Sequence, residues 1–482
     1  MIKKIYPLFY ICCLLIYLTA CKIDAPVFPE KPDVPTDTTK TPTTTIDKAL
    51  LTGWWKPTVN TKATVYFGTD NFFFQDTLNK DIAPIAGFWR TGGDTIKYSI
   101  NLGGPATGNY IVSKLTADSL VVTLAGTKTA YHKISLPAIT STAISTIAGT
   151  GIDGYTGDGG PATAALVSAK AGILVNKTGD IYFCDRGNNL VRKISAADGK
   201  ISTIAGSYGK SGGLYTNNSA ATDAVLSFPV FIAMDAANNI YVTESLANRI
   251  SKISPDGKIN CVAGCSMFPM QGFSGDGGPA TTAELREPQG ITVDSVGNIY
   301  FADLSNYRIR KINASDGKIN TIAGNGISGV SGDGGPAISA TLSALDLSFS
   351  KGNIYFTDFV GNRIRKIALS TGVISTIAGT GARGSTGNGG LATAAQLYLP
   401  FGISIDNKGD IYFAETNGGI IRKITNSTGI ITKIGGTGFD NFSGDGIHAT
   451  AYSMVGPYDV ATDAAGNVYI GEQARIRKIA AN

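Results

Sequence analysis

INTIAGNGISGVSGDGGPAISATLSALDLSFSKGNIYFTDFVGNRIRKI, from Ile319 to Ile367, is the stretch that decides the fold of this chain. It begins with a strand-like INTIAG, continues through a Gly-rich loop, and holds the short apolar runs LDLSF and NIYFTD before NRIRKI. Its opening strand recurs at spacings of 57, 58, 60, 55 and 57 residues, at Ile144–Gly149, Ile201–Gly206, Ile259–Gly264, Ile319–Gly324, Ile374–Gly379 and Ile431–Gly436. Such regular recurrence indicates a repeat architecture.

Each period holds four strand-like runs, which in the third unit are Gly290–Asp294, Asn298–Asp303, Arg308–Ile312 and Ile319–Gly324. A four-stranded sheet cannot bury both of its faces alone, so the copies are expected to pack face to face around an axis. The repeats begin with a lone fourth strand, Ile144–Gly149, and end with three strands of the sixth unit. The first strand can therefore complete the last blade. The sequence predicts an all-β, six-bladed β-propeller over residues 138–482.

The text GITVDSVGNIYFADLSNYRIRKI, residues 290–312, resembles the NHL repeat. GISIDNKGDIYFAETNGGIIRKI and DVATDAAGNVYIGEQARIRKI, which begin at Gly402 and Asp459, resemble it too. The resemblance covers about residues 140–479. It implies a six-bladed propeller, a scaffold that the NHL family uses for protein binding, RNA binding and enzymatic activity.

The composition favours short strands over long helices. The 482 residues include 60 Gly, and each Gly costs about 1 kcal/mol in a helix interior. The formal charge of +5 is small for this length and no segment carries a basic run, so the charge gives no indication of nucleic acid binding. We interpret the strand-three arginines, such as Arg308 and Arg310, as a solvated outer edge.

Residues 1–21 are predicted to be an export signal. Lys3 and Lys4 precede an apolar stretch that is too short to span a bilayer and that ends in Leu-Thr-Ala-Cys at Cys21. This ending resembles the lipobox of bacterial lipoproteins, which implies cleavage before Cys21 and lipidation of its thiol. The prediction is an outer-membrane lipid anchor on the periplasmic or the cell-surface side. Residues 22–45, rich in Pro and Thr, are predicted to be an extended tether.

Residues 46–137 are predicted to form a separate β domain. Short apolar runs such as LTGWW and GFWRTGGDTIKYSI alternate with turn pairs, which is typical of an antiparallel meander. The pattern resembles the small lipocalin-like domains of secreted Bacteroidota proteins, which implies a short antiparallel barrel. Trp54, Trp55 and Trp89 are expected to plug this barrel, with a role at a ligand mouth as the alternative.

Three cysteines lie beyond the signal segment: Cys184, Cys261 and Cys265. Cys184 is expected to be a small core residue. Cys261 and Cys265 are four residues apart on an expected strand. Extended spacing would place them about 13 Å apart, too far for a disulfide unless a bulge closes the gap.

The Gly-rich loops contain GxGxxG at Gly149, Gly151 and Gly154. A dinucleotide site needs a following helix inside a βαβ unit, and these loops lead instead into GDGGPAT and its variants. We therefore expect glycines with positive φ in a connecting loop, followed by one helical turn. Asp158, Asp276, Asp333, Asn388 and Asp445 are interpreted as turn residues, with a calcium site as the alternative. The second unit departs from this pattern at Leu214–Asn218.

Every unit ends its second strand in an acid: Asp185, Glu244, Asp303, Asp358, Glu415 or Glu472. In three units an Arg follows five residues later, at Arg249, Arg308 and Arg363, which predicts an ion pair within the blade. Leu190 and Ile420 stand at this position after Asp185 and Glu415. These two acids are therefore candidate ligand-binding residues.

We expect a binding module for a glycan, a peptide or an envelope protein, with no nucleic acid partner, no cofactor, and the membrane contacted only through the lipid. The binding face is predicted to consist of the fourth-to-first-strand loops and the second-to-third-strand hairpins. Its candidate aromatic residues are Tyr155, Tyr208, Tyr215, Phe268, Phe273, Phe439 and Phe442. The alternative is a metal-assisted hydrolase or lyase with a site at the propeller axis. The chain has only His132 and His448, which argues against a histidine-based centre.

Overall fold

The structure is a computed structural model. It describes residues 143–481 except 211, 213–214, 266–270, 439–441 and 443, together with the backbone of eight strands between Gly53 and Lys133. Cys21, the tether, Phe268 and Phe439 lie outside the described residues, as do the side chains of the three tryptophans. No helix in the described part of the chain is long and apolar enough to cross a membrane.

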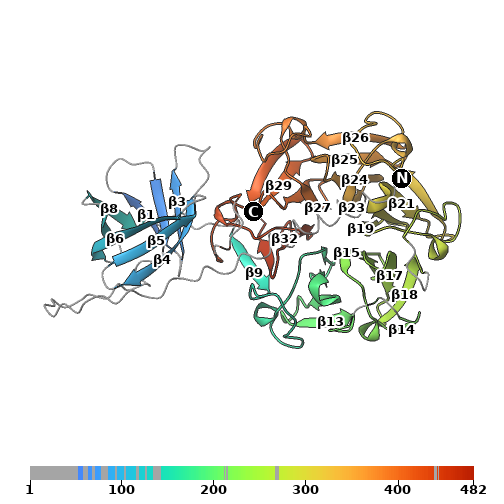
Figure 1. Ribbon diagram of the computed structural model, residues 1–482, viewed down its shortest axis with the longest axis horizontal. Helices are drawn as coiled ribbons and strands as arrows, with labels where there is room; N and C mark the ends of the chain where they lie inside the picture. Colours follow the sequence, from blue (N-terminus) through green and yellow to red (C-terminus); the bar gives the residue numbers. More distant parts are fainter. Residues whose placement is uncertain are drawn as a thin grey trace, which may run out of the picture.

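The residues from 143 onward form six antiparallel blades around one axis (Figure 1). Blade one contains β10 (Ile173–Val175), β11 (Ile181–Asp185), β12 (Leu190–Ile194) and β13 (Ile201–Ala205). Blade two contains β15 (Pro229–Met234), β16 (Ile240–Glu244), β17 (Arg249–Ile253) and β18 (Lys258–Ala263), with β14 (Ser219–Ala220) on its outer edge. Blade three contains β19 (Pro288–Val293), β20 (Ile299–Asp303), β21 (Arg308–Ile312) and β22 (Ile319–Ala323).

Blade four contains β23 (Ala344–Ser350), β24 (Asn353–Asp358), β25 (Arg363–Ala368) and β26 (Val373–Ala378). Blade five contains β27 (Pro400–Ile405), β28 (Ile411–Glu415), β29 (Ile420–Thr425) and β30 (Ile430–Gly435). Blade six contains β31 (Asp459–Thr462), β32 (Val468–Gly471) and β33 (Ile476–Ile479), completed by β9 (Ile144–Ala148). β9 pairs antiparallel with β33, Ile144 opposite Ile479, so the prediction of six blades closed by the first strand is confirmed.

Each fourth-to-first-strand loop runs along the outer edge of the next blade and then turns inward between blades. A single 3-10 turn marks the inward step, at η1 (Ala162–Ala164), η3 (Ala221–Asp223), η4 (Ala280–Thr282), η6 (Ala337–Ser339), η7 (Ala392–Ala394) and η8 (Ala449–Ala451). The first residue of each turn is a buried alanine, whose small side chain lets the loop pass between two sheets. Gly149 and Gly151 have φ of +85° and +94°, which confirms the expected role of the loop glycines.

One position of each first strand lines the axis. The six residues there are, in blade order, Gly172, Phe231, Gly290, Asp346, Gly402 and Asp459, so every second blade contributes a side chain. The glycines are required by close backbone approach: a Cβ on Gly172 would lie 2.7 Å from the Cα of Phe231. Phe231, Asp346 and Asp459 are buried and fill the axis at this depth.

Cys261 and Cys265 form a disulfide with 5.7 Å between their Cα atoms, so the expectation that they lie too far apart is wrong. β18 ends at Ala263, and Gly264 adopts φ of +66°, so the chain turns before it reaches Cys265. Cys184 is a free, fully buried core residue, as expected.

The backbone of the N-terminal strands pairs in sequence order and closes into a barrel, because β1 (Gly53–Pro57) also pairs with β8 (Thr127–Lys133). The six strands between them are β2 (Ala63–Phe67), β3 (Asn71–Asp76), β4 (Ile85–Gly92), β5 (Thr95–Asn101), β6 (Pro105–Leu115) and β7 (Ser119–Leu124). The lipocalin-like character of this domain stays a prediction.

Candidate functional site

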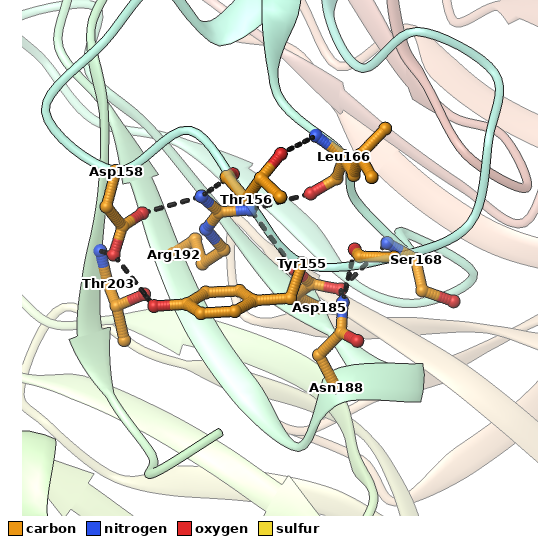
Figure 2. Close-up of polar contacts among 10 residues, drawn as sticks. Tyr155, Thr156, Asp158, Leu166, Ser168, Asp185, Asn188, Arg192 and Thr203 are labelled. Atoms are coloured by element: carbon orange, nitrogen blue, oxygen red, sulfur yellow. Dashed lines mark hydrogen bonds and ion pairs between the residues drawn. The ribbon is translucent and has the colours of Figure 1, made fainter. Parts of the chain in front are cut away.

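A buried arginine on the third strand holds the Gly-rich loop in place in five of the six blades, as Figure 2 shows for blade one. Arg192 is fully buried, and its Nη1 lies 3.4 Å from Oδ2 of Asp185 at the end of β11. Its Nη2 donates to Asp158 Oδ1 (2.6 Å) and to the carbonyl of Thr156 (2.8 Å) in the loop. One guanidinium thus joins two strands to a long loop. We call this arrangement the arginine clasp.

The clasp recurs in most blades. The arginines at this position are Arg192, Arg310, Arg365, Arg422 and Arg477, all fully buried. Arg310, Arg365 and Arg422 pair with the strand-two acids Asp303, Asp358 and Glu415 at 3.1 to 3.5 Å. Burial raises the pKa of Asp303 and Asp358 to about 6 and that of Glu415 to about 7, while the arginine acts in the opposite direction. The clasp therefore neutralises acids that would otherwise be unfavourable inside the fold.

Blade two replaces the clasp by a different set of contacts. Ser251 stands where the other blades have the buried Arg, and Arg249 pairs with Glu244 instead, Nη2 to Oε2 at 2.8 Å. The ring of Tyr215 from the divergent loop lies 4.1 Å from the Arg249 guanidinium, and its hydroxyl contacts Ser251 Oγ. The divergence of this loop is therefore a structural compensation.

These contacts correct several predictions. Asp185 and Glu415 are fully buried and paired with Arg192 and Arg422, so the premise that they lack an arginine is wrong. The expected pair of Glu244 with Arg249 is confirmed. Asp303 and Asp358 instead bind the arginine seven residues later, since Arg308 and Arg363 donate to loop carbonyls.

The strand-three clasp arginines are buried, so their interpretation as a solvated edge is wrong. The loop aspartates that a calcium site would use are occupied: Asp158, Asp276, Asp333 and Asp445 each accept from a clasp arginine. The clasp was not predicted because each strand-two acid was paired with the residue five positions later, whereas the clasp arginine is seven positions later. The available signal was an Arg recurring at one strand-three position in five of six units.

Among the aromatic candidates that the structure describes, most cover arginines. Tyr155 stacks on Tyr208 with 4.4 Å between ring centroids and lies 5.1 Å from Arg192. Phe273 lies 3.7 Å from the Arg308 guanidinium, and Phe442 lies 3.6 Å from that of Arg475. Of the five candidates within the described residues, Tyr208 and Phe273 are exposed. The rings therefore fix their loops first, and two of them also face solvent.

Exposed apolar side chains gather at the same end of the propeller, where the strand-four loops begin and the second-to-third-strand hairpins turn. They are Ile152, Tyr208, Leu246, Phe273, Ile327 and Val360, which we call the apolar loop surface. Leu246 and Ile327 are 62% and 61% exposed, although burying either would be favourable. Six exposed apolar side chains on loops and hairpins at one end make this face a candidate interaction surface.

At this end of the axis, side chains lie close together. Arg186 lies 4.7 Å from the Phe228 ring and 5.7 Å from that of Tyr458. The cavity beneath them, lined in part by Phe231 and Phe401, has a volume of about 10 Å³, enough for about one water. Within the described residues, no three His, Cys, Asp or Glu side chains are grouped so that they could hold a metal ion.

Asp346 and Asp459 form a carboxyl pair at the axis and hydrogen bond to one another. Each also accepts a backbone N–H from the blade that follows it, Ile403 to Asp346 (2.8 Å) and Ile173 to Asp459 (2.9 Å). Burial, followed by repulsion from Asp459, raises the pKa of Asp346 well above its usual range. Burial also raises the pKa of Asp459 to about 7. The pair therefore holds a proton at neutral pH.

Comparison with known proteins agrees with the fold. Residues 264–330 match the teneurin NHL domain family. Teneurin-1 of Gallus gallus is 27% identical over 290 residues, covering 43% of this chain and 11% of the teneurin. SUPPRESSOR OF QUENCHING 1, a chloroplastic protein of Arabidopsis thaliana, is 26% identical over 265 residues, covering 51% of this chain and 24% of the plant protein. The chain thus spans a quarter or less of these relatives.

Among solved structures, a protein of unknown function from Bacteroides thetaiotaomicron superposes with a TM-score of 0.53 at 17% identity. The match covers 83% of this chain and 94% of that one. This likeness concerns the fold alone. Together with the family match, it supports an NHL-type propeller.

The clasp predicts a strong difference between two arginines of β25. Replacing Arg365 with Met leaves Asp358 buried without its cation, which is expected to cost about 3–5 kcal/mol of unfolding free energy. Replacing Arg363 with Met removes a bond to the Thr380 carbonyl at an exposed position and is expected to cost less than about 1 kcal/mol. Denaturant unfolding of both variants measures the difference, and equal costs would contradict the clasp.

The axial pair predicts a pH-dependent stability. Between pH 4 and about 7 the folded pair keeps a proton that the unfolded chain releases, so the pair's contribution to stability falls as pH rises. Asp459→Asn removes one acid of the pair and its repulsion of Asp346, so this dependence should weaken, and the melting temperature of the variant relative to the parent protein should rise from pH 5 to pH 8. Asp294, whose pKa is lowered, is the control: Asp294→Asn should give a constant offset over this range. Parallel curves for Asp459→Asn and the parent protein would refute the shared proton.

Proposed function

We propose that this protein is an exported, lipid-anchored binding module that holds a protein or peptide partner on the apolar loop surface of its NHL-type propeller. The observation that carries the proposal is the exposure of six apolar side chains at one end of the ring. They lie on loops of blades one to four, a spread that suits an extended polypeptide better than a glycan seated in a pocket.

The arginine clasps support this role. They fix the loops that carry Ile152, Phe273 and Ile327, so at these positions a partner meets a surface that is already ordered and less entropy is lost on binding. We assign the lipid anchor to Cys21, from its lipobox-like context, and a lipocalin-like domain to residues 46–137, from their strand pattern.

The proposed surface predicts which residues control partner capture. Replacing Leu246 and Ile327 together with Ser should weaken binding at least about tenfold, because each removes exposed apolar area that a partner would cover. The matched control is Val296→Ser, which removes a side chain that is 73% exposed in the first-to-second-strand hairpin at the other end.

The measurement is recovery of partners from a detergent extract of the cell envelope, followed by titration of the recovered partner. The control variant should capture the same partner as the parent protein. If the double variant captures it equally well, the partner binds elsewhere.

The lipid anchor is tested separately. Cys21→Ser should move the protein from the membrane fraction to the soluble fraction, because no acyl chain can be attached. Cys13→Ser, within the same apolar segment, should leave it membrane-bound. A Cys21→Ser protein that stays with the membrane would overturn the assignment. Protease treatment of intact cells then tells which side of the membrane the propeller faces.

A further inference from the structure

A second candidate site lies between blades five and six, apart from the apolar loop surface. Its cavity has a volume of about 380 Å³, within the range of small-molecule sites. The ionisable side chains that line it include Asp406, Lys408, Lys423, Lys433, His448 and Asp463. The first-to-second-strand hairpins of both blades contribute to its wall, which places it toward the end of the ring opposite the loops.

Two substitutions that break the repeat meet in this cavity. Lys433 of β30 occupies a position where the other fourth strands have Thr146, Thr203, Cys261, Thr321 and Thr376. His448 precedes η8, where the other turns are preceded by Pro161, Ala220, Pro279, Pro336 and Leu391. The other blades form without a Lys or a His at these positions, so blade formation does not require either substitution.

Lys433 brings a positive charge that the protein does not balance. Burial alone lowers its pKa, and no carboxylate of the described residues forms an ion pair with it. In blade one the loop aspartate Asp158 lies beside the equivalent strand residue and accepts the N–H of Thr203 (3.0 Å). Blade five has Asn388 at the aspartate position, so this source of negative charge is missing next to Lys433.

The acids on the wall of the cavity are already occupied. Asp406 accepts the hydroxyl of Tyr412 (3.1 Å), and Asp463 accepts that of Tyr469 (3.0 Å). Lys423 is paired with Asp410, Nζ to Oδ2 at 2.6 Å. Lys433 is therefore the partly buried cation of this cavity that has no carboxylate partner, whereas Lys408, also on the wall, is exposed to solvent.

His448 adds a second donor. Its Nδ1 accepts the backbone N–H of Thr450 (3.3 Å) and contacts the Thr450 hydroxyl (2.7 Å). Because Nδ1 is an acceptor, the neutral ring carries its proton on Nε2. Burial lowers the pKa of His448, so this neutral, Nε2-protonated form is the one present at pH 7. The cavity thus presents an ammonium and an imidazole N–H.

We propose that this cavity binds a small ligand through a single carboxylate, with Lys433 as its counter-ion and His448 as a hydrogen-bond donor. The one partly buried cation without a carboxylate partner matches a monoanion, whereas a phosphate dianion would also be repelled by Asp406 and Asp463. Ile434, Val468 and Ile479 complete the lining and offer apolar contact to a compact ring or short chain. An acidic monosaccharide has this combination of size and charge.

The test titrates the full chain with glucuronate, glucose and inorganic phosphate and measures binding by calorimetry. Glucuronate should bind at millimolar concentration more tightly than either of the others. Lys433→Thr installs the residue of the sister blades, which those blades tolerate, and should weaken glucuronate binding about tenfold or more because a charge-assisted bond is lost. His448→Pro, also a sister-blade residue, should weaken it less.

The control is Lys366→Thr, which removes the same charge from strand three of blade four, outside the cavity, and should leave binding unchanged. Absence of glucuronate binding, equal binding of glucose, tighter binding of phosphate, or full binding by Lys433→Thr would each overturn the proposal. Partner capture on the apolar loop surface uses other residues. Its success or failure is therefore independent of this result.

Discussion

The structure depends on how each blade accommodates one buried carboxylate. The second strand of each sheet ends in a carboxylate that the packing of neighbouring blades removes from water. A guanidinium from the third strand answers it, and because a guanidinium has five N–H groups in a fixed fork, it also reaches the loop that arrives from the previous blade. Neutralising one buried acid thereby also fixes a long Gly-rich loop.

The sequence predicted the propeller, its six blades and its closure, because these follow from the spacing and phase of six copies. It did not predict the partners of the acids. Strand pairing places residue Asp303 opposite Arg308, yet the side chain that reaches Asp303 belongs to Arg310, two residues further along the same face. Spacing along the chain predicts which residues lie opposite one another in the sheet. It does not predict which long side chain is buried next to the acid and pairs with it. The Cys261–Cys265 disulfide was not predicted because both cysteines were assumed to lie on one extended strand. Gly264, with a left-handed backbone conformation, follows the end of that strand and brings the two cysteines together.

Departures from the repeat are of two kinds, and the structure separates them. In blade two, Ser251 and Tyr215 depart from the repeat, and Arg249 takes over the buried acid Glu244, so the balance of charge is restored within the blade. In blade five, Asn388 and Lys433 change together and leave a positive charge unbalanced. A departure from the repeat whose charge is balanced within the blade is explained by folding. A departure whose charge is not balanced is the basis of the proposed ligand site.

The closure of blade six has a mechanical consequence. β9 is the only strand of the described propeller that is separated from the rest of its blade by the whole ring, and Ile144, its first residue, pairs with Ile479 near the other end of the chain. A pull on the chain ahead of Ile144 would peel β9 from β33 one residue pair at a time instead of shearing all pairs at once. Asp445 resists this peeling, because it accepts both the N–H and the hydroxyl of Thr146. A propeller held from its N-terminal side would therefore open first at this seam, while the other five blades stay intact.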